Sequence, residues 1–579
     1  MKERDFVEER GGLKPPLPEL GDVLVDPSAS NKLASRIMEL GVFRATVHTT
    51  VYRMHKFWAR RPWAIFRALI RLFTKPGDII LDPFAGGGVT LVEGLIERRK
   101  VIAVDINPLA IKIMIHQVKP LDIETYRLAL EKLKLRLDPI ASELYRFRCP
   151  RCRGQGVAKW TEFDSLTDEP LRVSYECSSC GGEGVLETEA GSPFLPRLPT
   201  FPIVEIDVGD KTADLLKRGI RFYHELFTSR NLFAVLKIKE EIERVCRTEG
   251  LEEAESFLLF TLSSTLKWAS KMSHLRGEVL EGWAMHSYWI YPKFVEVNVW
   301  RQFLNRARAV IQGKEFSNKF IGDFAREAKS FEDMCGGSTY MVIEADARSL
   351  PLPSECVDIV ITDPPYGGNV NYGELADYFL WLFGVKSPKR GEIVINRTRR
   401  FTLSDYECGL REVFRECYRV LKPSSLLIST FNSKDAKILA AFIRALRGAG
   451  FAFRGVSFQP YLKAYETTFH ALQVDSMPFD FVFFFEKDGA CMHDIESIDD
   501  LSAWMEERLE NCKSLGLTER EFRASVYPRL VWFMAHTDME ELHLGAARLE
   551  EIVKRERTYF AGVRGRVIKE RRDNRRATA

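Results

Sequence analysis

The sequence predicts an α/β protein built on a doubly wound sheet, and three observations carry this prediction. Residues 77–113 follow the order strand, helix, strand, which is typical of a unit with parallel strands. Two stretches of β-branched residues, 340–344 and 357–361, have the length of buried strands in such a sheet. Helical and strand-like stretches alternate again between residues 405 and 486. We therefore expect a sheet that a long insertion interrupts after its second strand.

Length and composition bound the class of protein. The chain has 579 residues, of which 45% are hydrophobic and 28% charged, as expected for a folded protein of several domains. The formal net charge is +3, so any affinity for nucleic acid has to come from local basic patches. We find no apolar run that could span a bilayer and no apolar core of a signal peptide, and expect a cytoplasmic protein without membrane contact. Its 11 cysteines should then be reduced, and regularly spaced ones indicate metal.

The N-terminal part divides into two segments by composition. Residues 1–40 are rich in proline and mixed in charge, which predicts an extended arm. Residues 41–77 contain no acidic side chain but many Lys and Arg. Within them, 63–73 has helical spacing, and Pro62 suits a first helical turn.

A glycine-rich turn, DPFAGGG at residues 82–88, joins the first strand to the following helix. Its glycines permit positive φ angles and a close approach of the backbone to a ligand. The turn lacks the Gly-Lys-Ser/Thr of a phosphate-binding loop, and Asp82 would repel phosphate. An amine or sulfonium suits Asp82 better, while Asp105, after the second strand, can accept both hydroxyls of a ribose. S-adenosylmethionine (AdoMet) meets these demands. Asp346 could accept a hydrogen bond from the adenine amino group of AdoMet, or it could cap a helix.

The segment VDIVITDPPYGG, residues 357–368, ends a strand with two prolines. Prolines cannot donate hydrogen bonds to a neighbouring strand, so the strand has to end at Asp363. In open α/β sheets, ligands bind beyond this end of the strands. The alternative is a proline turn without a catalytic role.

LDPFAGGG, VDIN and ITDPPYGG together resemble the motifs of the exocyclic-amino methyltransferases, which methylate N6 of adenine or N4 of cytosine in DNA. The resemblance implies a Rossmann-like, AdoMet-dependent methyltransferase sheet. YRMHKFWARRPW, residues 52–63, further resembles a segment of prokaryotic adenine-specific DNA methylases that carry a zinc ribbon, in which it lies close to the AdoMet pocket. The cofactor-binding residues implied by the motifs are Asp82, Pro83, Phe84, Gly86, Gly88, Asp105, Asn107 and Asp346.

The reaction of that family explains the residues after the strand. An exocyclic amine is a poor nucleophile, because its lone pair is delocalised into the ring. The Asp363 carboxylate and the Pro364 carbonyl can each accept one of its N–H groups and aim the lone pair at the sulfonium methyl. Tyr366 would stack on a base extracted from the duplex. The predicted catalytic set is therefore Asp363, Pro364, Pro365 and Tyr366.

CPRCRGQG and CSSCGGEG repeat one pattern of paired cysteines and glycines. Two thiolates separated by two residues can hold one metal ion, and the glycines allow backbone N–H groups to turn towards the sulfurs. With all four positions filled by sulfur no water can be activated, which predicts a structural zinc. The spacer between the pairs suits a hairpin. The predicted ligands are Cys149, Cys152, Cys177 and Cys180.

These features predict the following organisation: an arm at 1–40, the first part of the methyltransferase domain at 41–120, a zinc ribbon at 145–190, a helical insertion for target recognition at 205–335, the second part of the methyltransferase domain at 336–490, and a helical C-terminal extension with a basic tail at 495–579.

The predicted activity is transfer of a methyl group to N6 of adenine in double-stranded DNA, since aspartate at the first position of the tetrapeptide is commoner in the adenine enzymes. The alternatives are a cytosine-N4 DNA methyltransferase and an RNA guanine-N2 methyltransferase. The RNA enzymes usually carry an N-terminal RNA-binding domain, for which the stretch before the first strand is too short. A non-catalytic DNA-binding subunit is the alternative from another class. Candidate protein partners belong to restriction or phage-defence systems. The surfaces expected to contact DNA phosphates are residues 44–75, the cysteine knuckles and the tail 564–576.

Overall fold

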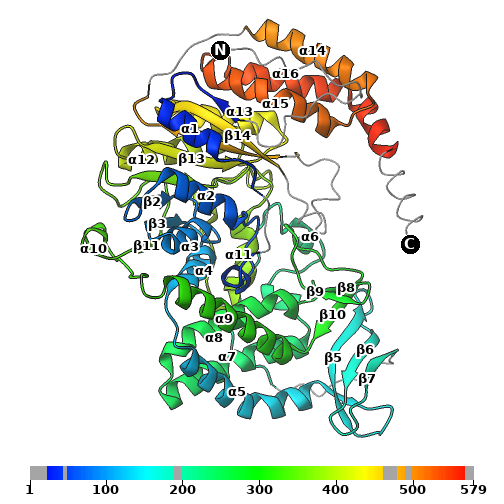
Figure 1. Cartoon of the computed structure of the whole chain (residues 1–579). Coiled ribbons are helices and arrows are strands. Elements are labelled where there is room, and N and C mark those ends of the chain that lie inside the picture. Colours follow the sequence, from blue (N-terminus) through cyan, green and yellow to red (C-terminus); the bar gives the residue numbers. More distant parts are fainter. Residues whose placement is uncertain are drawn as a thin grey trace. The chain divides into compact units, whose positions relative to one another are not determined.

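The computed structural model divides into two compact units, which we describe separately (Figure 1). The structure describes residues 23–43, 48–187, 197–460, 477, 479–489 and 497–566. Unit 1 contains the described parts of 1–46, 354–366 and 406–579, and unit 2 those of 47–353 and 367–405. Within these ranges, no helix has both the length and the apolar character that crossing a bilayer requires.

Unit 1 contains a mixed β-sheet portion whose strands neighbour one another in the order β1, β14, β15, β13, β12. β12 and β13 are parallel, whereas β15 is antiparallel to both β13 and β14, and β1 is antiparallel to β14. The sheet is therefore mixed rather than parallel throughout, because antiparallel neighbours need no crossover helix. The bounds are β1 (Val23–Val25), β12 (Ile359–Thr362), β13 (Leu426–Phe431), β14 (Ala452–Pro460) and β15 (Phe479–Glu486).

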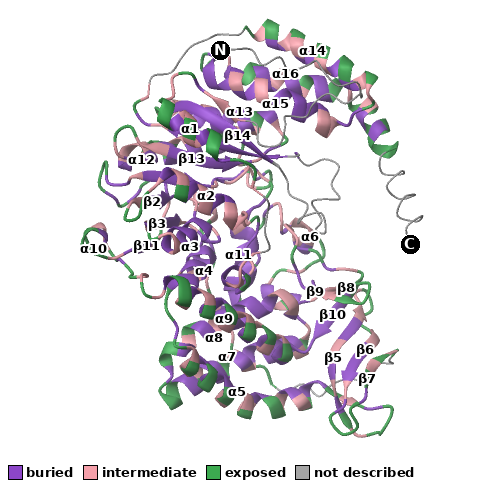
Figure 2. Cartoon of the chain, viewed as in Figure 1, coloured by how far each residue is buried: buried purple, intermediate pink, exposed green. Residues whose placement is uncertain are grey.

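Aromatic side chains hold the helices of unit 1 on this sheet. Phe442 of α13 stacks on Phe431 of β13 with ring centroids 4.2 Å apart, and Tyr527 of α15 lies 5.8 Å from Phe481 of β15. Figure 2 shows that β13 and β14 are buried. The C-terminal helices predicted from the sequence are therefore part of the core of this unit. Its helices are α1 (Asn31–Glu39), most of α12 (Leu403–Val420), α13 (Ala436–Gly448), α14 (Ile498–Ser514), α15 (Glu519–His536) and α16 (Leu542–Arg555).

The predicted N-terminal arm is wrong for its described residues. β1 pairs with β14, and α1 begins after Ser30, whose side chain accepts a hydrogen bond from the Leu33 N–H. A buried hydrogen bond of 2.7 Å between Asp26 Oδ2 and His536 Nε2 ties this segment to α15. The prolines that suggested an arm lie mainly before residue 23, outside the described residues.

Unit 2 carries the strands that follow the basic segment. β2, β3 and β11 are parallel neighbours in that order, so the predicted strand–helix–strand unit is confirmed. A Cβ atom on Gly94 of α3 would lie 2.4 Å from Cγ2 of Val101, which explains why glycine is needed where α3 packs on β3. The bounds are α2 (Trp63–Phe73), β2 (Ile79–Asp82), α3 (Val89–Ile96), β3 (Lys100–Asp105), α4 (Pro108–Val118) and β11 (Tyr340–Glu344).

The long insertion also belongs to unit 2, and its two predicted parts share one sheet. The predicted hairpin of the cysteine-bearing part is present as β5 and β6, which are antiparallel. β10, from the helical part, pairs antiparallel with β5 and so joins the sheet that contains β4, β6 and β7. A boundary near residue 190 or 205 therefore does not separate two folded bodies. The strands are β4 (Arg146–Arg148), β5 (Gln155–Asp164), β6 (Pro170–Glu176), β7 (Glu183–Glu187), β8 (His274–Arg276), β9 (Val279–Glu281) and β10 (Lys293–Val297).

Long helices make up most of the remainder of unit 2. Their bounds, with those of shorter ones, are α5 (Ile123–Leu144), α6 (Ala213–Lys217), α7 (Ser229–Glu249), α8 (Glu252–Ala269), α9 (Val299–Ile321), α10 (Phe331–Cys335) and α11 (Tyr372–Leu380). Buried Lys314 of α9 donates to the carbonyls of His116, Gln117 and Lys119 at 3.1, 3.2 and 2.6 Å, which satisfies the C-terminal end of α4.

Candidate active site

The glycine turn of unit 2 has the backbone conformation that its sequence predicts. Gly86 and Gly88 have φ angles of 46° and 75°, and Gly88 is the residue that precedes α3. Asp82, only 3% exposed, accepts hydrogen bonds from the Phe84 N–H at 3.1 Å and from the Thr90 hydroxyl at 2.6 Å. Asp82 therefore holds the turn together. Pro83 lies buried within it.

Asp105 joins the end of β3 to this turn. One carboxylate oxygen accepts a hydrogen bond from the Gly86 N–H at 2.8 Å, and the other from the Asn107 N–H at 2.8 Å. Burial raises the pKa of the Asp105 carboxyl to about 6, although the N–H groups of Asn107, Gly86 and Ile106 favour its ionised form. The Asn107 side chain caps α4 by accepting from the Leu109 N–H at 2.9 Å. Asp105 and the glycine turn are thus one hydrogen-bonded group.

The basic segment before α2 covers the turn. A Cβ atom on Gly86 would lie 2.9 Å from Cε1 of Phe57, and one on Gly87 would lie 2.6 Å from Nε of Arg60. Ala59, between these two side chains, has a φ angle of 52°, which is uncommon for a residue with a side chain. Glycine at position 86 leaves space for the Phe57 ring, so the segment and the turn fit each other there.

Asp346 follows β11 and makes a two-pronged contact with Arg348. The Arg348 guanidinium donates to both carboxylate oxygens, with the shortest distance 2.5 Å. Hydrogen bonds and the charge of Arg348 hold the pKa of Asp346 below its usual range, against an opposing effect of burial. A Cβ on Gly391 would lie 2.2 Å from Cδ1 of Ile106 and 3.3 Å from an Asp346 oxygen, so the chain at 391 lies against both. Asp346 is not a helix cap.

The DPPY turn belongs to unit 1, where it follows β12. The hydroxyl of Thr430, in β13, donates to Oδ1 of Asp363 at 2.5 Å, and the Tyr366 hydroxyl donates to the same oxygen. The Tyr366 ring meets Phe431 edge to face, with centroids 4.9 Å apart. The Tyr406 hydroxyl donates to the Pro365 carbonyl at 2.6 Å. These contacts fix both the carboxylate and the backbone of the turn.

Sequence reasoning missed Thr430 and Tyr406. Thr430 reads as an ordinary strand residue, and Tyr406 as an ordinary residue of α12. Neither belongs to a motif, and their contacts depend on the pairing of β12 with β13 and on where α12 begins. The sequence-predicted site residues thus fall into two sets, with the DPPY residues in unit 1 and the proposed cofactor residues in unit 2.

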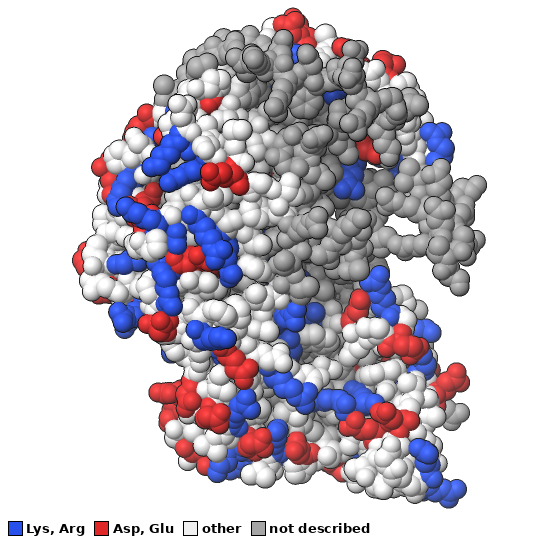
Figure 3. All heavy atoms as spheres, viewed as in Figure 1, with Lys and Arg blue, Asp and Glu red and all other residues white. Residues whose placement is uncertain are grey.

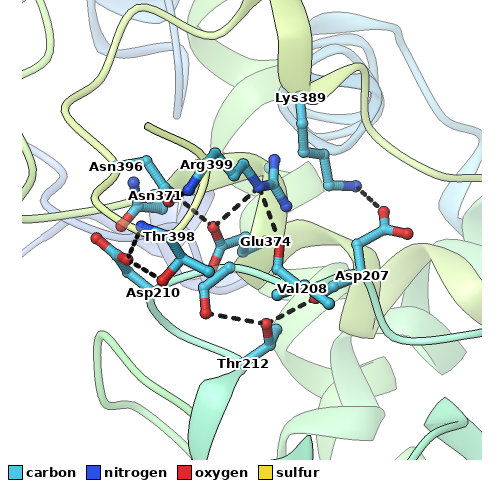
Figure 4. Close-up of polar contacts among 12 residues, drawn as sticks. Asp207, Val208, Asp210, Thr212, Asn371, Glu374, Lys389, Asn396, Thr398 and Arg399 are labelled. Carbon is cyan, nitrogen blue, oxygen red and sulfur yellow. Dashed lines mark hydrogen bonds and ion pairs between the residues drawn. The ribbon is translucent and has the colours of Figure 1, made fainter. Parts of the chain in front are cut away.

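The segment after DPPY belongs to unit 2 and is fastened to residues 207–212 by charged side chains (Figure 4). Buried Glu374 accepts from the Asn396 amide at 2.6 Å and from the Lys211 N–H at 2.7 Å, and lies 3.6 Å from Arg399. Asp210 accepts from the Thr398 N–H at 2.9 Å and from its hydroxyl at 2.6 Å. These contacts hold the stretch around α11 without involving a sequence motif.

The four predicted metal ligands come together in unit 2. Their sulfur atoms all lie within 4.8 Å of one another, with Cys149 and Cys180 3.7 Å apart and Cys152 and Cys177 3.6 Å apart. A tetrahedral ion with zinc–sulfur distances of about 2.3 Å would separate its sulfurs by roughly 3.8 Å, so the cluster fits zinc. The Gly154 N–H donates to Cys152 Sγ at 3.4 Å. The Cys180 N–H contributes most to lowering the pKa of the Cys177 thiol to about 6.

Residues 13–116 match the sequence model of a family described as DNA methylase, the N6/N4 methyltransferases. The chain is 20% identical over 383 residues to the type II methyltransferase M.MjaII of Methanocaldococcus jannaschii, covering 62% of this chain and 67% of that protein. It is 33% identical over 72 residues to the type II methyltransferase M.Cfr9I of Citrobacter freundii, covering 12% of this chain and about a quarter, 24%, of that protein. These matches support a relationship to the DNA methylases.

Among solved structures, one similar protein is described as a DNA modification methylase from Thermus thermophilus, in complex with S-adenosyl-L-methionine. The identity is 18%, the match covers 29% of this chain and 60% of that one, and the TM-score is 0.16. The cyclase SpnF reaches the same TM-score at 12% identity, over 26% of this chain and 58% of its own. Likenesses at these scores carry no argument about function.

Proposed function

We propose that this protein is an AdoMet-dependent DNA methyltransferase that methylates the exocyclic N6 amino group of adenine. The observation that carries the proposal is the Asp363 carboxylate at the end of β12, held by two hydroxyls in a turn of two prolines. The match of residues 13–116 to a DNA methylase family supports the same class of reaction.

Asp363 and the Pro364 carbonyl would act as the two acceptors for the target amine. A carboxylate offers about four acceptor positions, so the Thr430 and Tyr366 hydroxyls do not exhaust those of Asp363. Accepting both N–H groups withdraws the nitrogen lone pair from the ring and directs it, which is catalysis by orientation and charge placement. AdoMet, when bound, supplies the methyl group on a positively charged sulfur. Before a base could stack on its ring, Tyr366 would exchange the present hydroxyl contact for the base.

The cofactor would be held by unit 2. The Gly86 backbone is partly exposed at the turn, Gly88 is buried where the turn enters α3, and the Asp105 carboxylate lies beside Gly86 for the ribose hydroxyls. Asp82 would shape the turn, and Pro83, Phe84 and Asn107 would flank the cofactor. Asp346 would accept a hydrogen bond from the adenine amino group. The donor set is anionic and free of a phosphate-binding motif, which suits a cationic sulfonium ligand.

Zinc would be structural and bound by Cys149, Cys152, Cys177 and Cys180. All four positions of a tetrahedral ion would be taken by sulfur, so its contribution is to the folding of the insertion. The remaining helical part of the insertion is the proposed reader of DNA sequence.

The deciding experiment is methylation of duplex DNA with labelled AdoMet, followed by digestion to nucleosides and their separation. We expect the label in N6-methyl-2′-deoxyadenosine. Label in N4-methyl-2′-deoxycytidine would contradict the adenine assignment, and label in an RNA substrate assayed in parallel but not in DNA would contradict the DNA assignment. Asp363→Ala protein is the matched control, because it should bind AdoMet and transfer nothing.

A further inference from the structure

A cluster of cations lies where the basic segment meets α8 and α9 in unit 2. The basic segment provides Lys56, α8 provides Lys267, and α9 provides Arg306. The Arg306 guanidinium donates to the carbonyls of Arg53 and Met54 at 2.5 and 2.7 Å, which fixes α9 to the basic segment. The same guanidinium lies 5.3 Å from the centre of the Trp268 ring, and the Lys267 ammonium lies 4.5 Å from it. The three cations thus share one small region.

The two lysines differ from the ion-paired lysines of the same unit. Neither the Lys56 nor the Lys267 ammonium forms an ion pair with any residue in the described part of the chain, and both side chains are half-buried. By contrast, Lys132 pairs with Glu249 at 3.0 Å and Lys239 with Glu243 at 2.5 Å. Over the face seen in Figure 3, basic and acidic side chains are interspersed. Lys56 and Lys267 therefore differ from these ion-paired lysines, whose charge is balanced within the fold.

Electrostatics makes this arrangement costly in the absence of an anion. Burial, and then repulsion from Lys267 and Arg60, lowers the pKa of Lys56 to about 8. Burial and repulsion from Arg306 lower the pKa of Lys267 to about 8, while Glu281 acts in the opposite direction. Like charges held together in a partly dehydrated place destabilise the fold, and a bound anion would remove that cost.

The position of the cluster indicates which anion it would meet. Lys56 precedes Phe57, which covers Gly86 of the glycine turn. The cluster is therefore attached to the same segment that covers the proposed cofactor turn. An enzyme that extracts a base has to hold the backbone phosphates beside the gap. AdoMet itself carries a carboxylate, but Arg60, packed on Gly87, is the cation nearest the turn.

We propose that Lys56 and Lys267 together bind one backbone phosphate of the DNA substrate, with Arg306 holding their two elements in place. The inference rests on the proposed function and deepens it, since it assigns a DNA contact to the helical insertion. Phosphate contacts carry no sequence information, so this contact would serve any DNA sequence.

The test compares Lys56→Gln/Lys267→Gln with the control Lys132→Gln/Lys239→Gln, which removes the same charge from ion-paired lysines. Affinity for a short labelled duplex of mixed sequence is measured by fluorescence anisotropy over a salt series, and AdoMet affinity by calorimetry. We expect several-fold weaker DNA binding and a salt slope smaller by about 1 in the first variant alone, with AdoMet affinity unchanged. Lys56→Arg/Lys267→Arg should retain the slope.

An unchanged salt slope would overturn the inference, and so would a loss of AdoMet affinity equal to the loss of DNA affinity, because the anion would then be the cofactor carboxylate. Equal effects of the test and control variants on DNA affinity would mean that only the net positive charge of the protein matters, which would overturn the inference. If the wild-type protein binds DNA through these lysines but transfers no methyl group, the proposed function fails while the phosphate site stands.

Discussion

The Asp363 carboxylate is the residue on which the proposed chemistry depends. It is held by Thr430 and Tyr366, so its direction is set before any substrate arrives. An acceptor that the Thr430 hydroxyl already orients needs little reorganisation during the reaction, even when Tyr366 exchanges its contact with Asp363 for the base.

We expect Asp363→Ala to abolish methyl transfer and leave AdoMet binding intact. Losing one positioned polar group of this kind costs about 10²- to 10⁴-fold in rate. Single-turnover methyl transfer and calorimetry with AdoMet measure the two properties separately. Turnover like that of the wild type in this variant would contradict the mechanism.

Thr430 should act as a positioning residue through Asp363. Thr430→Val keeps the shape of the side chain but removes the hydroxyl, so kcat should fall roughly tenfold, the equivalent of a hydrogen bond of about 1.4 kcal/mol, while KM for AdoMet stays constant. Thr430→Ser restores the hydroxyl and should recover most of the rate. A purely structural role would instead lower the melting temperature of both variants without separating their kcat values.

Asp105 makes AdoMet binding depend on pH. Ribose hydroxyls donate to the ionised carboxylate, so bound cofactor lowers the pKa of Asp105 from the value of about 6 that burial gives it. Protonation then competes with the cofactor, and affinity should fall as the pH drops below about 6, by up to tenfold per pH unit. Calorimetric titrations with AdoMet between pH 7.5 and 5 would measure this dependence.

The matched variant for this titration is Asp105→Asn, which cannot be ionised. It should bind AdoMet more weakly than the wild type at pH 7 and show no change in affinity across the same pH range. A wild-type affinity that stays constant through pH 6 would mean that Asp105 does not contact the ribose.

At the scale of elements, the sequence predicts a helix or strand best where neighbouring residues alone determine it. Residues 340–344 form the predicted strand β11, and α2 begins after Pro62 as its ring geometry favours. β1 and β10 were missed because their partners, β14 and β5, lie far away in the sequence. No local pattern distinguishes such strands from loops, since their stability comes from pairing.

The same reasoning applies to the candidate site. The motif residues Asp363 and Asp105 could be identified from the ends of strands. The contact of Thr430 with Asp363 could not, because it is created by the neighbouring strand. Glu374 and Asp210 likewise have no motif, and their role in fastening the stretch around α11 appears only in the folded chain.

The cysteine-bearing sheet gives a prediction about metal. The purified protein should contain one zinc per chain, and Cys177→Ser should lose it, because a structural site contributes folding energy. Elemental analysis measures the metal, and hydrogen exchange over residues 146–187 measures the loosening, which should exceed that of β2 and β3. Cys246→Ser, a buried single cysteine of α7, is the control and should keep its zinc. Wild-type protein without metal would refute the site.

At the scale of the whole molecule, distant parts of the chain combine into one core. Unit 1 is assembled from three separate stretches of sequence, and its sheet portion takes β1 from near the start and β14 and β15 from residues 452–486. Arg523 and Glu550 form an ion pair of 2.7 Å between α15 and α16, and Glu550 also accepts from the Ala436 N–H at the start of α13. The C-terminal helices are thus bonded to the helix that follows β13, the strand of Thr430.

We therefore expect a chain shortened to end at residue 489 to lose the fold of unit 1 and with it methyl transfer. Removing α15 would expose Phe481 and leave the Lys434 carbonyl without the Tyr527 hydroxyl, which donates to it at 2.8 Å. Each large apolar side chain uncovered costs about 1.5–3 kcal/mol. Several are uncovered together, and their sum is comparable to the net stability of a typical domain, about 5–15 kcal/mol. The control is a chain that ends at residue 566, which lacks only the basic tail outside the described residues and should keep its melting temperature. Thermal unfolding and methyl transfer would be measured on both, and a chain ending at 489 that melts and reacts like the full chain would show that α14–α16 are dispensable to unit 1.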